Sequence, residues 1–209
     1  MKLFTRNNKK IMHDGVWGEN PVSWQALGIC SVLAVTVQLK TALVMGCILV
    51  FVMALSNTII SLLRKRIPSR IRIIVQLSVI ATLVILADQI LKAYVFDISK
   101  QLSIFVGLVI TNCIVMGRAE GFAMNHPPLK SLIDGVANAC GYAWILIGVA
   151  FFRELLGSGT LFGVAVIPQQ LYDMGYSNCG IFVLAPGAFF ILGVMIWIQR
   201  AVGALKRKA

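Results

Sequence analysis

The cysteines are the side chains in this sequence that are best suited to metal binding or redox chemistry. There are five: Cys30, Cys47, Cys113, Cys140 and Cys179. An odd number without close spacing argues against a disulfide framework, and no Cys-x-x-Cys pair completes an iron–sulfur or zinc motif on this chain alone. Cysteine also packs well in helices as a small hydrophobic residue. Each cysteine taken by itself is therefore explained more simply by packing than by ligation.

Cys30 and Cys113 differ from the other cysteines in their position. Each lies in a short apolar stretch interrupted by small or polar residues, VSWQALGICSVLAVTVQL and LSIFVGLVITNCIVMG respectively. Two thiolates in such surroundings are costly unless a metal neutralises them. A tetrahedral iron or zinc ion needs two further ligands, which a partner subunit of similar build would have to supply. Asn112 either hydrogen-bonds to a ligand sulfur or caps a broken helix.

Two acidic residues in apolar surroundings are candidates for a cation pathway. Asp88 lies in LVILADQILKA, where Lys92 four residues later makes a helical ion pair the simpler interpretation. Asp134 lies in SLIDGVANACG, where a carboxylate also complements the dipole of a helix N-terminus. Two further charged pairs are interpreted as charge balance at a membrane surface: Arg118 with Glu120, and Arg153 with Glu154.

Composition places these residues in a membrane. Hydrophobic residues make up 58% of the 209 residues and charged residues 13%, and the mean hydropathy is +0.86. A soluble domain is nearer half apolar and a quarter charged, and a soluble fold of this size could not bury so much apolar surface. Disorder is excluded because it requires low hydrophobicity. We therefore expect an integral membrane protein without a soluble domain large enough to bind NADH.

Six stretches approach the roughly 20 apolar residues of a transmembrane helix. Their length and uniform hydrophobicity favour helices over the alternating strands of a barrel. No secretory signal precedes them, since residues 1–20 are polar. The predicted spans cover residues 22–39, 41–63, 71–93, 102–117, 132–152 and 180–198.

The basic residues orient these spans. The net charge is +11, and 15 of the 19 Lys and Arg residues fall on one side of a six-span arrangement, in the N-terminal arm, the second and fourth loops and the C-terminal tail. This asymmetry predicts that both termini lie in the cytoplasm. The basic clusters flank spans and are not interleaved with aromatic residues, so we expect membrane lipid and no nucleic acid as partner.

The spans divide into two sets of three. We expect a cytoplasmic arm over residues 1–20, a membrane domain over 21–200 with halves of about 21–97 and 98–200, and a basic cytoplasmic tail over 201–209. Because three is odd, the second half must insert upside down, which is the inverted-repeat architecture of many transport proteins. The predicted fold class is an all-α integral membrane protein with its first and fourth spans interrupted. Such interruptions at matching positions indicate a midplane site, where Cys30 and Cys113 would approach each other.

Residues 71–124 are similar to a known family. The segment IRIIVQLSVIATLVILADQILKAYVFDISKQLSIFVGLVITNCIVMGRAEGFAM closely resembles the D-type membrane subunits of bacterial sodium-translocating NADH:quinone oxidoreductases. The segments ALGICSVLAVT, SLIDG, FFRELLGSGTLFG and LAPGAFF resemble the same subunits, so the likeness covers nearly the whole chain. TNCIVMGRAE is also shared with the E-type subunit of the related Rnf complex, whereas VQLSVIATLVILADQILKAY and FDISKQLS look more like the quinone-reductase branch.

The resemblance implies a six-span subunit that pairs with a homologous sister subunit, of E-type and opposite orientation. In this family the cysteines matching Cys30 and Cys113 are iron ligands. With two cysteines of the sister chain they hold an intramembrane iron centre, generally described as a [2Fe–2S] cluster. The centre relays electrons between a cytoplasmic NADH-oxidising subunit and a covalently bound flavin on the opposite side, and the complex exports Na⁺.

The resemblance also implies a six-subunit complex in the bacterial inner membrane. NADH, FAD, FMN and riboflavin belong to its NADH-oxidising, flavin-carrying and quinone-binding subunits, and the covalent-flavin attachment motif of the family is not apparent in this sequence. We expect enzyme activity only as a subunit of this NADH:ubiquinone translocase, with no catalytic residue on this chain alone. Three alternatives stay open: the equivalent subunit of an Rnf ferredoxin:NAD oxidoreductase, a stand-alone cation transporter with its cation site at the interrupted spans and Asp88, and a scaffold subunit without a cofactor.

Overall fold

The computed structural model describes residues 12, 14–18, 20–68, 70–94, 106–162, 164–165 and 180–208. These residues are almost entirely helical, which confirms the predicted all-α fold. The elements in chain order are η1 (Asp14–Gly18), α2 (Ile29–Val35), α3 (Leu39–Leu63), α4 (Arg72–Tyr94), α6 (Val106–Ile110), α7 (Cys113–Arg118), η2 (Ala119–Ala123), α8 (Pro128–Ser158), β1 (Thr160–Leu161), β2 (Val164–Ala165), η3 (Gly180–Phe182) and α10 (Ala185–Lys208).

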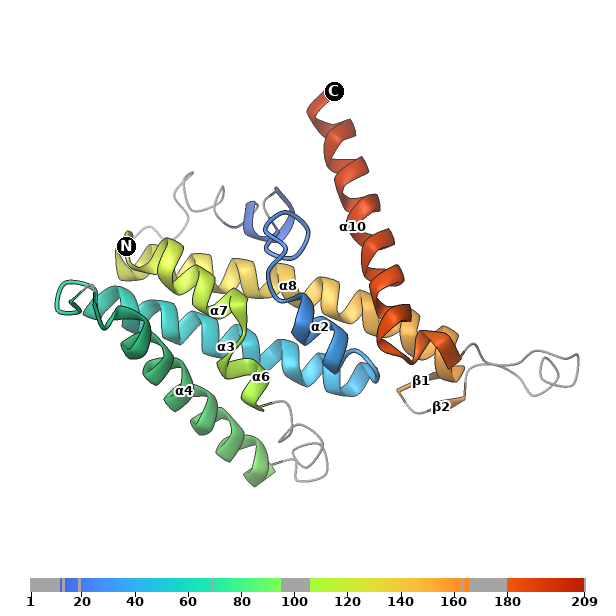
Figure 1. Ribbon diagram of the computed structural model, residues 1–209, viewed down its shortest axis with the longest axis horizontal. Helices are drawn as coiled ribbons and strands as arrows, with labels where there is room; N and C mark the ends of the chain where they lie inside the picture. The colour runs from blue at the N-terminus through green and yellow to red at the C-terminus, as the bar shows by residue number, and fades with distance from the viewer. Residues whose placement is uncertain are drawn as a thin grey trace, which may run out of the picture.

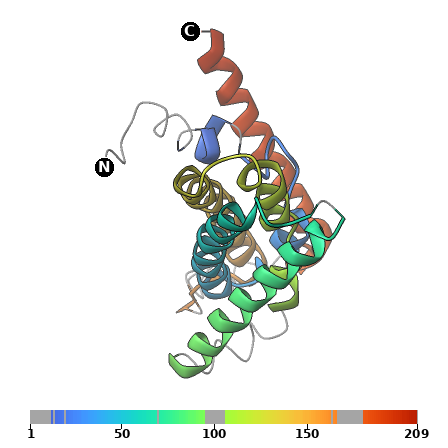
Figure 2. The ribbon, with the colours of Figure 1, turned by 90° about the vertical axis from the view of Figure 1, so that its left-hand side faces the viewer.

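Helices α3 and α8 form the central pair of the molecule and run side by side along its long axis (Figures 1 and 2). They are antiparallel: the backbone N–H of Leu39, where α3 begins, donates to Glu154 near the end of α8. At the other end, the Ser61 hydroxyl donates to the carbonyl of His126, just before α8. With 25 and 31 residues, the two helices are about 37 and 46 Å long. Both therefore exceed the ~30 Å hydrocarbon core of a bilayer.

Small residues allow α3 and α8 to approach closely. A Cβ atom at Gly135 of α8 would lie 2.8 Å from the carbonyl oxygen of Met53 in α3. A Cβ atom at Gly46 of α3 would lie 3.2 Å from the Cβ of Ala143 in α8. Helices in membranes gain van der Waals contact through such small residues, since lipid supplies little hydrophobic drive for association.

Helices α4 and α10 lie at the periphery of the central pair. Figure 1 shows α4 diverging from the pair on one side, and α10 leaving it near the end of α8 and projecting away on the other. Both expose large apolar side chains, which only lipid or other apolar protein surfaces can cover favourably. Among the described residues, four helical segments are long and apolar enough to cross a membrane: Leu39–Leu63, Arg72–Ala93, Pro128–Ser158 and Ala185–Gly203.

The first and fourth predicted spans are broken, as their sequences indicated. In the first, the helix α2 begins only at Ile29, because Ala26 (φ 55°) and Gly28 (φ 79°) adopt left-handed conformations that an α-helix does not accommodate. In the fourth, α6 ends at Ile110 and α7 begins at Cys113. Residues 102–105 of this predicted span lie outside the described residues. We refer to α2 and α7 as the half-helices.

The ends of the second half differ from the predicted spans. Helix α8 starts earlier than predicted because Pro128 fits the first helical turn, and it ends later, at the left-handed Gly159 (φ 67°). A short antiparallel ribbon of β1 and β2 follows, with Thr160 opposite Ala165. Helix α10 continues through residues 201–208, which the sequence analysis assigned to a separate basic tail. Most of the predicted arm over residues 1–20 lies outside the described residues, as does Cys179.

We expect Gly135→Ala to weaken the packing of α3 against α8. The added Cβ would force the Met53 carbonyl to move, and overpacking of this kind costs ~1–3 kcal/mol. Gly193→Ala is the matched control, because a Cβ at Gly193 in α10 meets no atom within 4 Å. Thermal unfolding of the purified protein in detergent measures both variants. Equal unfolding temperatures for the two variants would contradict the close approach of α3 and α8.

Candidate metal centre at the two broken spans

The two half-helices bring Cys30 and Cys113 together. Cys30 is the second residue of α2, and Cys113 is the first residue of α7. The backbone N–H of Gly28 donates to the Sγ atom of Cys113 across 3.1 Å. The side chains of Cys30 and Cys113 are also close enough to hydrogen-bond to each other. The structure therefore joins, from opposite halves of the chain, the two thiols that the sequence analysis selected. We call them the sulfur pair.

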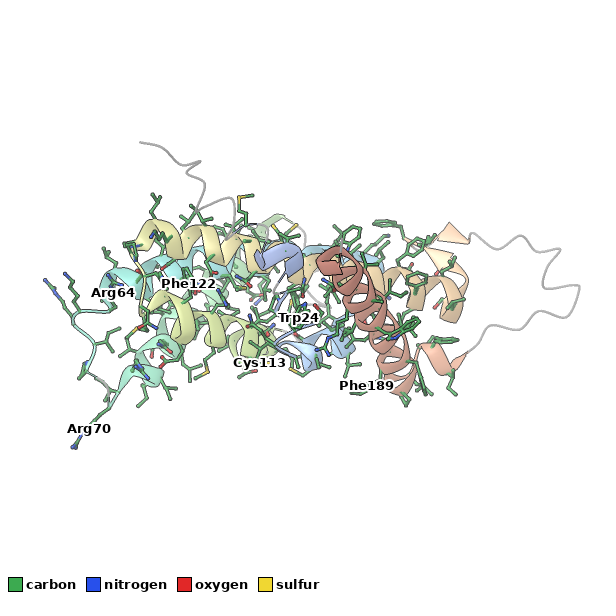
Figure 3. The ribbon with its side chains drawn as sticks, turned by 90° about the horizontal axis from the view of Figure 1, so that it is seen from above. Trp24, Arg64, Arg70, Cys113, Phe122 and Phe189 are labelled. Atoms are coloured by element: carbon green, nitrogen blue, oxygen red, sulfur yellow. The ribbon has the colours of Figure 1, made fainter. Side chains whose placement is uncertain are left out.

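The sulfur pair lies near the middle of the molecule's length and faces outward. Cys30 is exposed and Cys113 is half-buried. Figure 3 shows Cys113 near the midpoint of the long axis, while Arg64 and Arg70 project from one end. Because α3 and α8 run along this axis and are long enough to cross a bilayer, a membrane perpendicular to the axis would have Cys113 close to its midplane. The pair is accessible to a partner at this depth.

Glycine at position 28 is what allows the half-helices to meet. Its φ angle of 79° is in the left-handed region, which other residues rarely adopt. A Cβ atom there would also lie 2.9 Å from the side chains of both Ile114 and Tyr142. A larger residue would therefore be strained in its backbone and would push α2 away from α7. Glycine permits the close approach that carries the N–H of residue 28 to the Cys113 sulfur.

Asn112 caps the half-helix that begins at Cys113. Its side-chain oxygen accepts a hydrogen bond from the backbone N–H of Ile114 at 3.3 Å. Its side-chain nitrogen donates to the hydroxyl of Ser31 in α2 at 3.1 Å. Of the two roles that the sequence left open for Asn112, the structure therefore shows the cap. The same side chain also ties the start of α7 to the other half-helix.

Tyr142 of α8 lies beneath the sulfur pair. It is fully buried, and its hydroxyl is 2.7 Å from the hydroxyl of Ser31. The Ser31 hydroxyl is also 2.9 Å from the carbonyl oxygen of Gly28. We call these residues, together with Asn112, the tyrosine network. Sequence reasoning did not select Tyr142 or Ser31, although a tyrosine within the apolar run GYAWILIGVA was a usable signal.

The end of α2 is held by Arg153 and Glu154 of α8. The guanidinium of Arg153 donates to the carbonyl of Leu33 at 3.0 Å and to the hydroxyl of Thr36 at 2.6 Å. Glu154 accepts the backbone N–H of Leu39 at 2.7 Å. Arg153 and Glu154 are only 2% and 5% exposed. The prediction that they balance charge at a membrane surface is therefore wrong, because both are used inside the protein to satisfy backbone groups in the last turn of α2 and at the start of α3.

The described part of the chain offers the sulfur pair no further metal ligand. Within it, no group of three or more His, Cys, Asp or Glu side chains is placed to hold a metal ion. Cys47 and Cys140 are exposed in α3 and α8. Cys47 lines an apolar groove of about 220 Å³ with α4 residues such as Ile90.

The two candidate acids for a cation pathway both form ion pairs. Asp88 pairs with Lys92 one turn later in α4. Asp134 is almost fully buried and binds the Arg118 guanidinium through both oxygens, and Asn138 donates to it at 3.0 Å. Neither carboxylate is hydrogen-bonded to the sulfur pair, and a role for either in sodium movement stays a prediction. Arg118 therefore pairs with Asp134, whereas Glu120 pairs with Arg72.

These features define an all-α membrane subunit whose two broken spans present adjacent thiols. The model of the family described as "Rnf-Nqr subunit, membrane protein" matches residues 8–196. The chain is 57% identical over 198 residues to the D-type subunit of the Na(+)-translocating NADH-quinone reductase of Photobacterium profundum, covering 95% of this chain and 94% of that protein. The chain belongs to the Rnf-Nqr family of membrane subunits, and the resemblance drawn from its sequence is confirmed.

Asp134→Asn should destabilise the protein by ~3 kcal/mol, because it leaves the largely buried Arg118 guanidinium without its counter-charge. The double variant Asp134→Leu with Arg118→Met removes both charges, so we expect it to recover much of that loss. Thermal unfolding of the three proteins measures the effect. A double variant less stable than Asp134→Asn would contradict a structural pair. A stable double variant without sodium-dependent activity would instead assign the Arg118–Asp134 pair to the cation pathway.

Proposed function

We propose that this chain is the D-type membrane subunit of a sodium-translocating NADH:quinone oxidoreductase. In this proposal Cys30 and Cys113 hold one half of an intramembrane iron centre, and a sister subunit supplies the other half. The observation that carries the proposal is the sulfur pair itself: two thiols from opposite halves of the chain, adjacent, outward-facing and near the middle of the molecule's long axis. The family membership and the named relative support the assignment to this type of complex.

The residues present fit an iron centre shared between two chains. Iron–sulfur clusters are held by four cysteine thiolates, and the sulfur pair provides two on an accessible face. The N–H of Gly28 is already directed at the Cys113 sulfur, which favours the anionic ligand form. Bound in this position, the centre would supply single-electron transfer. A homologous subunit presenting the same motif from the other side would complete the set of four ligands.

The work of this chain is to hold the sulfur pair rigidly at a depth that neither aqueous side reaches easily. Helices α3 and α8 span the membrane, and α8 clamps the half-helix α2 at both ends through Tyr142 and Arg153. An electron carrier at this depth divides the membrane crossing into two shorter steps. In our proposal, the NADH-oxidising, flavin-carrying and quinone-binding functions belong to the other five subunits of the complex, and Na⁺ is the exported ion.

We further propose that the subunit lies in the bacterial inner membrane with both termini in the cytoplasm. The basic residues support this orientation. Arg64 and Arg70 lie on the loop between α3 and α4 and project from one end of the molecule (Figure 3). An excess of basic residues on one face marks the cytoplasmic side of a membrane protein. We also propose the predicted division into inverted halves at about residues 97 and 98, because α3 and α8 are antiparallel and each follows a broken span.

The equivalent subunit of an Rnf complex is the second candidate, because the family description covers both branches. The two differ in the soluble partner, which is ferredoxin in the Rnf case. A stand-alone cation transporter has less support, since Asp88 and Asp134 are both engaged in ion pairs. Electron delivery from NADH to quinone by the intact complex, with no requirement for ferredoxin, would separate the first two candidates.

Replacing either member of the sulfur pair should abolish the iron centre. In complexes carrying Cys30→Ala or Cys113→Ala, we expect loss of the iron signal and of quinone reduction. NADH oxidation by an artificial acceptor should continue, because it takes place on another subunit. Iron analysis, electron paramagnetic resonance and both activities measure these outcomes. Cys47→Ala and Cys140→Ala are the controls and should retain iron. Unchanged iron content in Cys113→Ala would overturn the proposal.

A further inference from the structure

The tyrosine network contains a hydrogen-bonded chain whose directions can be worked out from the number of protons available. A serine hydroxyl donates one hydrogen bond and accepts two. The Ser31 hydroxyl has three neighbours in range: the Gly28 carbonyl at 2.9 Å, the Tyr142 hydroxyl at 2.7 Å and the Asn112 side-chain nitrogen at 3.1 Å. The carbonyl can only accept and the amide nitrogen can only donate.

These constraints assign every proton in the chain. Ser31 gives its single proton to the Gly28 carbonyl, because that oxygen has no proton to offer. Tyr142 must then donate to Ser31, and the amide of Asn112 donates to the second lone pair of Ser31. All the hydrogen-bonding capacity of the Ser31 hydroxyl is used. Tyr142 therefore holds the Ser31 oxygen by a donated hydrogen bond, and Ser31 in turn holds the Gly28 carbonyl.

Gly28 connects this chain to the sulfur pair. Its carbonyl receives the Ser31 proton, and its N–H donates to the Cys113 sulfur. Gly28 is in a left-handed conformation. Because glycine is the least restricted residue, its own backbone sterics do not hold it there, so contacts with other residues must fix its orientation. The ring of Tyr142 also packs on Gly28 closely enough to exclude a Cβ atom. Tyr142 therefore restrains Gly28 through both its ring and its hydroxyl.

We propose that Tyr142 is a positioning residue that fixes the N–H of Gly28 on the Cys113 sulfur and thereby raises the reduction potential of the iron centre. This inference rests on the proposed function. A reduced centre carries one more negative charge than an oxidised one. A donor directed at a ligand sulfur stabilises the more negative state, and hydrogen bonds to ligand sulfurs are known to tune such potentials. The same contact couples α8, one of the two central spans, to the electron carrier.

The test uses the intact complex with Tyr142→Phe, which keeps the buried ring and removes only the hydroxyl. We expect iron content to stay at the wild-type level and the midpoint potential of the centre to become more negative, measured by a redox titration followed by electron paramagnetic resonance. Ser31→Ala should shift the potential in the same direction. The double variant should shift it no further than the larger single shift, because both changes interrupt one chain.

Ser56→Ala is the matched control for the loss of a buried serine hydroxyl. Ser56 is fully buried in α3, and its hydroxyl donates to the Met53 carbonyl of the same helix. Its removal should leave the potential unchanged. A wild-type potential in Tyr142→Phe with full iron content would overturn the role of Tyr142 while leaving the iron centre intact. Retention of iron in Cys113→Ala would instead overturn the proposed function, so the two failures are distinguishable.

Discussion

The structure depends on one close contact, in which the backbone of Gly28 meets the sulfur of Cys113. This contact joins the two broken spans, and nothing larger than glycine fits there without displacing Ile114 or Tyr142. The central helix pair supports the contact from below, since Tyr142 and Arg153 both belong to α8. The close packing of α3 on α8 at Gly135 and Gly46 is therefore part of the site, because it sets where α8 places those side chains.

Two helices broken inside a membrane leave backbone N–H and C=O groups without helical hydrogen-bond partners, and polar side chains supply partners for some of these groups. Backbone groups without partners cost several kcal/mol in hydrocarbon. Here the free groups around α2 are satisfied by side chains from α8, with Arg153 on the carbonyl of Leu33 and Glu154 on the N–H of Leu39. Asn112 does the same for α7. Among the described residues, several buried polar side chains thus lie where the spans are interrupted, and those interruptions are what bring Cys30 and Cys113 together.

Periodicity and hydrophobicity were enough to predict α3 and α4 to within two residues, because long apolar runs bounded by polar loops determine such spans. The breaks at Gly28 and Asn112 were also visible as small and polar residues in short runs, which is why Cys30 and Cys113 could be selected. The roles of Tyr142 and Arg153 could not be predicted. Their partners on and just after α2 lie more than a hundred residues away in sequence, and no local pattern specifies which face of α8 meets α2.

The most direct test of this account is whether Cys30 and Cys113 form a disulfide with each other. In a variant with serine at positions 47, 140 and 179, the iron would be removed by a chelator and the thiols oxidised briefly by oxygen with copper phenanthroline. Mass spectrometry of the digested protein should then find one intramolecular crosslink between the two cysteines, reversible by dithiothreitol and much reduced when the iron is retained. Absence of this crosslink after iron removal would contradict the account.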